Sequence, residues 1–232
     1  MNHPTVSVVI PVRNVALYLP ETLANLRSQT IQPAETLVVD DGSTDATAQI
    51  AQDSQFVRYL RQEPAGAGPA RNRGAEAATS EFLAFIDADD LWLPEKLALQ
   101  LEAFQQQPAI DMVFARIEEF ASPDLSPAEA ATIRPRPEPL AGPSAITLLM
   151  RRTAFLETGG FPTELPLGEF IAWYERATHA GLRSLVLPQI LARRRLHATN
   201  QGRQNRAHLS AFALIAKQAL ERKRQQQSNA QA

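Results

Sequence analysis

The residues most suited to chemistry are three acids that follow an apolar run. In the stretch FLAFIDADDLW, residues 82–92, the first five positions are apolar and the acids are Asp87, Asp89 and Asp90. Carboxylates this close repel one another, and removing them from water costs further free energy. The spacing therefore predicts that a positively charged group binds beside them.

Length, charge and cysteine content exclude several classes of protein. The chain has 232 residues, a hydrophobic content of 44% and a formal net charge of −2, which indicates one core domain and no nucleic-acid partner. It has no cysteine, so disulfides, thiol nucleophiles and cysteine zinc sites are excluded. The N-terminal apolar run is too short for a signal peptide, and no window approaches the roughly 20 residues of a membrane span. We expect a cytoplasmic protein.

The first half of the chain alternates between predicted strands and helices. Apolar positions at helical spacing, such as Leu19, Leu23 and Leu26, predict helices. Runs rich in β-branched and aromatic residues predict strands at residues 6–10, 35–41, 56–60, 81–86 and 110–115. This order is typical of an α/β fold with a mostly parallel central sheet flanked by helices.

Local signals predict how the connecting segments are built. Ser43 or Thr44 is expected to begin a helix as its N-cap, and Asp90 is expected to cap a helix that begins at Pro94. Residues 121–144 contain six prolines and are predicted to form a long loop. Further elements are expected over residues 145–188, then a helix over 203–224 and a disordered tail.

Polar residues converge on one edge of this predicted sheet. Ligands of open parallel sheets bind at the carboxyl ends of the strands. Asp41 ends the second strand, Asp87 and Asp89 end the fourth, and Arg13 and Asn14 follow the first. The topology therefore predicts a binding site to which three strands contribute.

Four ordered stretches carry a resemblance to a known family. VSVVIPVRN, VVDDGSTDAT, AGAGPARNRGAEAA and FLAFIDADDLWLPEKL resemble the N-terminal half of the family 2 glycosyltransferases, which have a single nucleotide-binding domain of the glycosyltransferase A-type. The resemblance covers residues 6–107 and resumes in RRTAFLETGGF and RRRLHATN. It implies a domain over residues 1–202, with a nucleotide-binding half (1–115) and an acceptor half (116–202), followed by residues 203–232.

The resemblance assigns roles at the nucleotide. Pro11 and Arg13 match the loop that meets the base and the ribose, with Asn14 beside them. Asp41 matches the acid that binds a pyrimidine base, and Arg71 matches a segment beside the nucleotide. The implied substrate is a nucleoside diphosphate sugar, with UDP as the expected nucleotide, and the implied enzyme is a hexosyltransferase-like glycosyltransferase that inverts the sugar.

The resemblance also supplies the missing positive charge. Asp87 and Asp89 form the family's Asp-x-Asp motif, with Asp87 nearer the ribose and Asp89 as the metal ligand. His197 matches a histidine that approaches the metal or the diphosphate. The implied cofactor is Mn²⁺ or Mg²⁺, because carboxylates hold a hard cation that bridges to phosphate oxygens.

The catalytic base is where the chain departs from the family. The family places an Asp after a Glu at the start of a helix; here Glu169 is followed by Phe170. Glu169 is the predicted base. Glu175 is the alternative, although its spacing of six places it off the same helical face. A third interpretation is a non-catalytic nucleotide-sugar-binding module.

Two further alternatives concern the function. A haloacid dehalogenase-type phosphatase also uses Asp-x-Asp after a strand, but Leu91 stands where its Thr or Val would be. Residues 193–224 contain nine basic residues and one acid, a net charge of +8. This segment is predicted either to contact anionic lipid at the inner face of a membrane or to be a solvated helix. The acceptor and the oligomeric state have no signal in the sequence.

Overall fold

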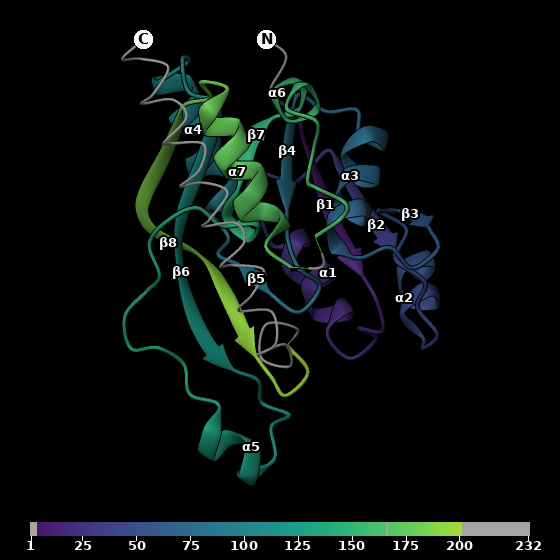
Figure 1. Cartoon of the computed structure of the whole chain (residues 1–232). Helices are drawn as coiled ribbons and strands as arrows, with labels where there is room; N and C mark the ends of the chain where they lie inside the picture. The colour runs from purple at the N-terminus through teal and green to yellow at the C-terminus, as the bar shows by residue number, and fades with distance from the viewer. Residues whose placement is uncertain (1–3, 166, 201–232) are drawn as a thin grey trace, which may run out of the picture.

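The computed structural model describes residues 4–165 and 167–200, which form one eight-stranded sheet flanked by helices (Figure 1). The strands are β1 (Val6–Val12), β2 (Glu35–Asp40), β3 (Val57–Arg61), β4 (Phe82–Phe85), β5 (Leu91–Trp92), β6 (Met112–Ala121), β7 (Leu149–Arg151) and β8 (Ser184–Leu196). The helices are α1 (Leu19–Arg27), α2 (Thr47–Asp53), α3 (Ala67–Ala77), α4 (Lys96–Gln106), α5 (Pro127–Thr132), α6 (Arg152–Glu157) and α7 (Glu169–His179), with a 3₁₀ turn η1 (Ala145–Thr147).

The strand order is β3-β2-β1-β4-β7-β6-β8-β5. Strands β3, β2, β1 and β4 are parallel, β7 is antiparallel to both neighbours, and β8 is parallel to β6. The predicted α/β fold with a mostly parallel sheet is therefore confirmed. The carboxyl ends of β1, β2 and β4 meet at one edge, as the sequence predicts.

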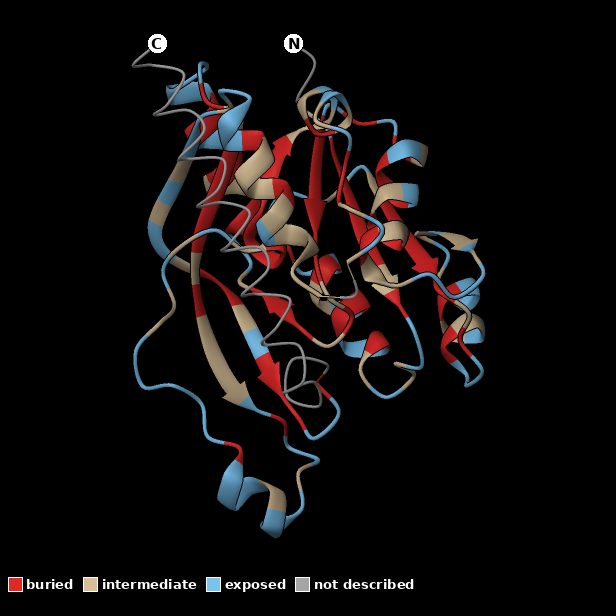
Figure 2. Ribbon diagram, in the orientation of Figure 1, coloured by how far each residue is buried: buried red, intermediate tan, exposed pale blue. Residues whose placement is uncertain are grey.

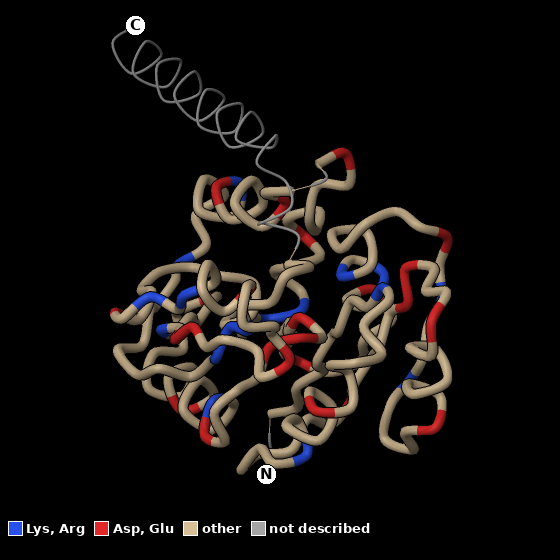
Figure 3. The backbone as a smooth tube through the Cα atoms, turned by 90° about the horizontal axis from the view of Figure 1, so that it is seen from below, with Lys and Arg blue, Asp and Glu red and all other residues tan. Residues whose placement is uncertain are grey.

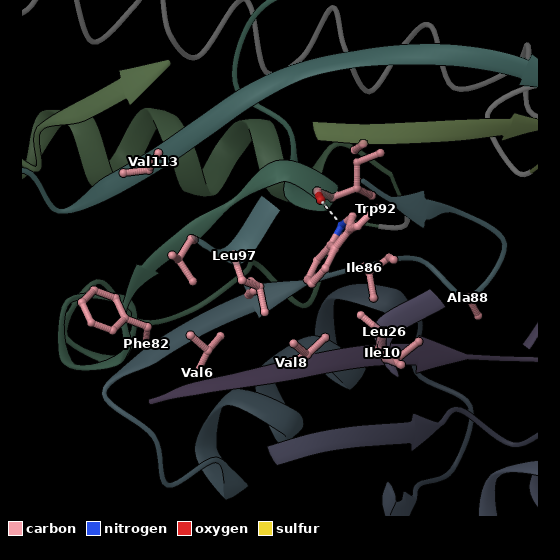
Figure 4. Close-up of a cluster of buried hydrophobic side chains, with 14 of the residues drawn as sticks. Val6, Val8, Ile10, Leu26, Phe82, Ile86, Ala88, Trp92, Leu97 and Val113 are labelled. Atoms are coloured by element: carbon pink, nitrogen blue, oxygen red, sulfur yellow. Dashed lines mark hydrogen bonds between the residues drawn. The ribbon is translucent and has the colours of Figure 1, made fainter. Parts of the chain in front are cut away.

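Helices cover both faces of the sheet, which explains why the strands are apolar on both sides. Val8 and Ile10 of β1 belong to one buried cluster and Val9 to the other. In the first cluster, the indole N–H of Trp92 donates to the carbonyl of Ile146 at 2.8 Å (Figure 4). Figure 2 shows the central strands buried throughout and α5 exposed. The site thus rests on a rigid support.

Helix α3 lies unusually close to β1 because of one glycine. A Cβ atom added to Gly74 would lie 2.3 Å from Cγ1 of Val9, so a side chain there would push the helix away from the sheet. The close approach fixes α3 and, with it, Arg71 one turn earlier. The buried face of α1, formed by Leu19, Leu23 and Leu26, is as predicted.

Three predicted local details are wrong. Helix α2 begins at Thr47 and has no side-chain cap, since the Ser43 hydroxyl instead accepts from the backbone N–H of Asn14. Helix α4 begins at Lys96, and Asp90 does not cap it. The predicted loop of residues 121–144 contains α5, because Ser126 and Glu129 form a reciprocal capping box.

Strands β6 and β8 extend beyond their neighbours, with α5 near their far end (Figure 1). Strand β8 is longer than predicted, and Arg193, Arg194 and Arg195 lie on it opposite Glu118, Glu119 and Phe120. These arginines are therefore not part of a basic helix. The helix predicted over 203–224 and the tail lie outside the described residues. Within the described residues, no helix is long and apolar enough to cross a membrane.

Candidate functional site

The candidate site lies at the carboxyl-end edge of the parallel strands. The loops after β1, β2 and β4 reach it from residues 1–115, and the end of β8 and the start of α7 reach it from residues 116–202. These two segments keep the names of the sequence prediction, the nucleotide-binding half and the acceptor half. Figure 3 looks onto this edge from below the view of Figure 1 and shows acidic and basic positions side by side near the centre. The charges predicted to converge therefore do so.

Arg71 joins the two halves of the site. Its guanidinium donates to Oδ1 of Asp87 at 2.5 Å and to Oε1 of Glu169 at 2.7 Å. The Arg71 side chain is buried, whereas that of Asp87 is 39% exposed. Burial by itself lowers the pKa of Arg71, but the charges of Asp87 and Glu169 raise it above its ordinary value. The three residues form one charged unit, here called the Arg71 bridge.

Asp89 and His197 also lie together. Oδ2 of Asp89 is 2.7 Å from Nε2 of His197, although the residues are 108 positions apart. The other ring nitrogen, Nδ1, is 2.8 Å from the Thr199 hydroxyl, which orients the imidazole. The Asn200 side chain donates to the same Asp89 oxygen at 3.4 Å and accepts from the backbone N–H of His197 at 2.7 Å.

A buried arginine that the sequence reasoning missed supports this pair. The Nε of Arg195 donates to the backbone carbonyl of Asp89 at 2.8 Å, and its Nη2 donates to Glu21 at 2.5 Å. The guanidinium lies 5.2 Å from the Tyr18 ring centroid and 4.6 Å from that of Phe120. Alternation of side chains along a strand would place Arg195 on the inward face. This signal could be used only if β8 were predicted to extend to residue 195.

Asp90 is the structural member of the acidic group. It is buried, and its Oδ1 accepts from the backbone N–H of Arg195 at 2.8 Å. Burial first, and then the charges of Asp89 and Asp87, raise the pKa of Asp90 well above its ordinary value, which favours its neutral form. Of the three acids, Asp87 and Asp89 thus remain to meet a ligand.

The predicted base-binding residue, Asp41, is buried and well supplied with donors. Its carboxylate accepts from the side chain of Gln62 at 2.9 Å and from the backbone N–H groups of Ala65 at 2.7 Å and Gly66 at 2.9 Å. Arg13 lies 3.8 Å from it and is half exposed. A carboxylate has about four acceptor positions. Asp41 therefore shapes the loop over 62–66 with three of them, and Arg13 approaches the same carboxylate.

Pro11 and Asn14 lie in the same loop region with different roles. Pro11 is half-buried within β1, opposite Val39 of β2. Asn14 has a positive φ of 52°, and its side-chain oxygen accepts from the backbone N–H of Thr44 at 2.8 Å. Asn14 therefore links the loops after β1 and β2.

The donor set beside Asp89 fits a hard divalent cation. Asp89 supplies a carboxylate and His197 an imidazole nitrogen, and both ligands suit Mn²⁺, while carboxylate and water suit Mg²⁺. Within residues 4–165 and 167–200, no group of three or more His, Asp or Glu residues is arranged to hold a metal by itself. Such a cation would complete its shell with water and phosphate oxygens, as Mg²⁺ does at nucleotide sites.

The predicted catalytic residue, Glu169, is the first residue of α7. Its side chain is 14% exposed and contacts Arg71. Helix α3 has a glycine at the point of approach, because a Cβ on Gly68 would lie only 3.2 Å from Cγ of Glu169. Phe170 turns away into aromatic packing, 6.1 Å from Phe114 and stacked on Tyr174 at the same centroid distance. The position that carries an acid in the resembled family is therefore a partly buried aromatic packed against the core here.

One cavity lies elsewhere. It has a volume of about 440 Å³ and opens beside the first residue of β2, at the opposite edge of the sheet, where its lining includes Arg27, Glu35 and Phe56. None of the candidate site residues lines it. The candidate site is therefore defined by the convergence of charged groups and not by this cavity.

Known proteins share the sequence and the fold. The putative glycosyltransferase EpsH of Bacillus subtilis is 43% identical over 98 residues, which are 40% of this chain and 28% of EpsH. The putative teichuronic acid biosynthesis glycosyltransferase TuaG of the same organism is 37% identical over 110 residues, 45% of this chain and 43% of TuaG. The chain thus matches less than half the length of either relative.

A solved structure resembles the fold over most of the chain. The crystal structure of S. aureus TarS 1-349 in complex with UDP-GlcNAc matches with a TM-score of 0.69 and 23% identity, over 84% of this chain and 60% of that one. At this identity the likeness shows the fold. Residues 7–156 match the sequence family described as glycosyl transferase family 2, and the chain belongs to that family.

Proposed function

We propose that the protein transfers a sugar from a nucleoside diphosphate sugar, with UDP as the nucleotide, to an acceptor hydroxyl with inversion at the sugar. The observation that carries the proposal is the 2.7 Å contact between Asp89 and His197, which joins motifs from the two halves of the chain beside the Arg71 bridge. Family membership supports sugar transfer, and the TarS structures with UDP-GlcNAc and UDP support the nucleotide.

In the proposed mechanism, Asp89 and His197 would hold Mn²⁺ or Mg²⁺, which would supply charge stabilisation for the leaving diphosphate. Asp41 accepts a hydrogen bond from the base, and Pro11, Arg13 and Asn14 flank the nucleotide. Asp87 contacts the ribose while Arg71 holds its carboxylate in place.

Glu169 is the proposed general base. Arg71 binds its Oε1 at 2.7 Å, which leaves Oε2 to take the proton of the acceptor hydroxyl as that oxygen attacks the anomeric carbon. The bond from the anomeric carbon to the diphosphate breaks on the opposite side, so the sugar inverts. Arg71 thereby fixes the base relative to Asp87, and positioning of this kind is worth several kcal/mol in catalysis.

The test is the Mn²⁺ dependence of UDP binding, measured by calorimetry. Asp89→Ala should weaken Mn²⁺-dependent binding by about 100-fold, or about 2.7 kcal/mol, because it removes the carboxylate ligand. Glu81→Gln is the matched control, since Glu81 forms an exposed pair with Arg151. Undiminished Mn²⁺-dependent affinity in Asp89→Ala contradicts the proposal.

A non-catalytic nucleotide-sugar-binding module is the second candidate, and Phe170 is the observation that favours it. Its packing on Phe114 and Tyr174 leaves no acid at the family's base position. Incubation with UDP-sugars and a panel of acceptors separates the two. UDP release coupled to a new glycoside supports transfer, whereas binding without any product supports the module.

A further inference from the structure

Arg116 of β6 lies opposite an irregularity in its partner strand β8. The ladder between β6 and β8 shifts its register on both sides of this residue, between Phe114 and Arg116 and between Arg116 and Ile117. The extra residues belong to β8, since β6 advances by two residues from Phe114 to Arg116 while β8 advances by four. Irregularities of this kind are common beside active sites. Nothing in the proposed mechanism uses Arg116.

The guanidinium of Arg116 lacks the partners that comparable arginines have. Among the described residues, Arg71, Arg116 and Arg176 have a buried Nε without a hydrogen-bond partner. Arg71 is compensated by two carboxylates, and Arg176 donates to the carbonyl of Gly160. For Arg116, no ion pair, hydrogen bond or ring contact of the side chain occurs within residues 4–165 and 167–200. A partly buried cation without a counter-charge is costly, which points to a ligand that supplies one.

The sheet register places Arg116 at the functional edge. Val113 of β6 and Ala84 of β4 both pair with Leu149 of β7, so the third residue after each, Arg116 and Asp87, lies at about the same level. Strands β4 and β6 are separated by β7, so they lie two inter-strand distances apart, about 9.5 Å. Strand β7 begins at Leu149, and the buried turn η1 that precedes it packs against both β4 and β6.

The surroundings assign Arg116 to the acceptor side. Strand β6 keeps its alternation past Arg116, because Val113 and Ile117 belong to one buried cluster and Phe114 to the other. Arg116 therefore lies on the face of Phe114, which packs on Phe170, the neighbour of Glu169. The proposed cation ligands, Asp89 and His197, instead lie with Arg195 and Tyr18. The face that holds Arg116 is thus the face that holds the proposed base.

We infer that Arg116 binds an oxyanion, a phosphate or carboxylate group, of the acceptor. A guanidinium offers parallel N–H donors that match such a group. Anion binding follows from Arg116 alone, whereas its assignment to an acceptor rests on the proposed function. The prediction for substrates is that anionic acceptors, such as sugar phosphates or uronic acids, are preferred over neutral ones.

The buried Nε–H of Arg116 allows a direct test by ¹H–¹⁵N NMR of the full chain. Its signal is assigned as the one lost in Arg116→Lys, and inorganic phosphate is the probe. We expect the signal to move as phosphate saturates, while the Arg176 Nε–H signal, the matched control, stays in place. Arg116→Gln should weaken phosphate binding by about 10-fold, as expected when a hydrogen bond to a charged group is lost.

Four outcomes decide the inference. An unmoved Arg116 signal at saturating phosphate overturns anion binding. If UDP with Mn²⁺ moves the signal and displaces phosphate, the oxyanion belongs to the donor and the acceptor assignment is overturned. If UDP binds without moving it and phosphate still does, the inference stands. In a fourth outcome UDP does not bind at all, which overturns the proposed function and with it the acceptor assignment, while the phosphate result alone decides whether Arg116 binds an anion.

Discussion

The two halves of the chain satisfy their charged groups in different ways. In the nucleotide-binding half, Asp41 receives three hydrogen bonds from residues 62–66, and Asp90 accepts a backbone N–H. In the acceptor half, Arg116 has no partner among the described residues, and Phe170 fills the position expected for an acid. Asp41 and Asp90 are therefore satisfied within the protein, whereas the side chain of Arg116 is not.

This difference indicates which charged groups would select the ligand. Loops held by their own hydrogen bonds are preorganised, and under the proposed function their ligand is the nucleotide. Arg116 instead has no counter-charge among the described residues, so a ligand bound there would have to supply one. Ligands without a negatively charged group would then bind more weakly. The Arg71 bridge couples the two, because one guanidinium holds Asp87 of the first half and Glu169 of the second.

The largest expected effect is on the rate of sugar transfer, when the proposed base Glu169 is substituted. Glu169→Gln should reduce transfer by about 10²–10⁴-fold, the usual worth of a general base, and leave UDP affinity unchanged. Single-turnover rates and calorimetry measure the two quantities. Glu164→Gln, an exposed acid in the preceding loop, is the control. Transfer that survives unchanged would place the base on another residue.

Phe170→Asp tests whether the second position of α7 tolerates the acid that the family has there. Phe170 contacts Phe114, Phe161, Trp173 and Tyr174, so a carboxylate there would lose aromatic packing and be desolvated. We expect a loss of about 2–4 kcal/mol in the free energy of unfolding, measured by urea denaturation.

Phe170→Leu is the matched control for this substitution and should cost about 1 kcal/mol, since it keeps an apolar side chain. A Phe170→Asp variant as stable as Phe170→Leu would show that this helix start tolerates an acid. Increased transfer in that variant would then favour the interpretation that the natural chain binds without transferring.

The nucleotide-binding half was predictable because its signals are local. Strand runs that end in Asp41 or Asp87 lie at the edge by topology alone. The acceptor half depends on long-range pairing: Arg195 is buried only because β8 extends along β6, and Phe170 turns inward only because Phe114 lies opposite. The short helix α5 was missed for a different reason, since its capping box lies within a proline-rich segment that otherwise indicates a loop.

A smaller effect is expected from Asp41→Asn in the nucleotide-binding half. The amide nitrogen would replace one acceptor oxygen and face the N–H groups of Ala65 or Gly66. We expect a loss of about 1–3 kcal/mol in stability and weaker UDP binding. Asp45→Asn is the control, because Asp45 makes similar backbone hydrogen bonds in an exposed turn. Equal UDP affinity in both variants would remove Asp41 from the base-binding role.

The smallest effect concerns Lys96, which lies in the core between the halves. Its Nζ donates to Gln100 at 2.7 Å, and the Gln100 amide in turn donates to the carbonyls of Val113 and Thr147. Burial lowers the pKa of Lys96 well below its ordinary value. Between that lowered pKa and the unfolded value of about 10.4, the unfolded chain binds more protons, so stability rises with pH.

Lys96→Met should remove this contribution to the slope, which is at most about 1.4 kcal/mol per pH unit. The absolute stability of the variant also reflects the donor that Gln100 loses, so the slope is the quantity to compare. Urea unfolding between pH 7.5 and 9.5 measures it, with Arg27→Met, an exposed cation of α1, as the control. Wild-type stability should rise more steeply with pH than that of Lys96→Met. Parallel slopes would mean that Lys96 stays charged in the core, and its contact with the Trp92 ring, 3.8 Å from Nζ, would then have to stabilise the ammonium group.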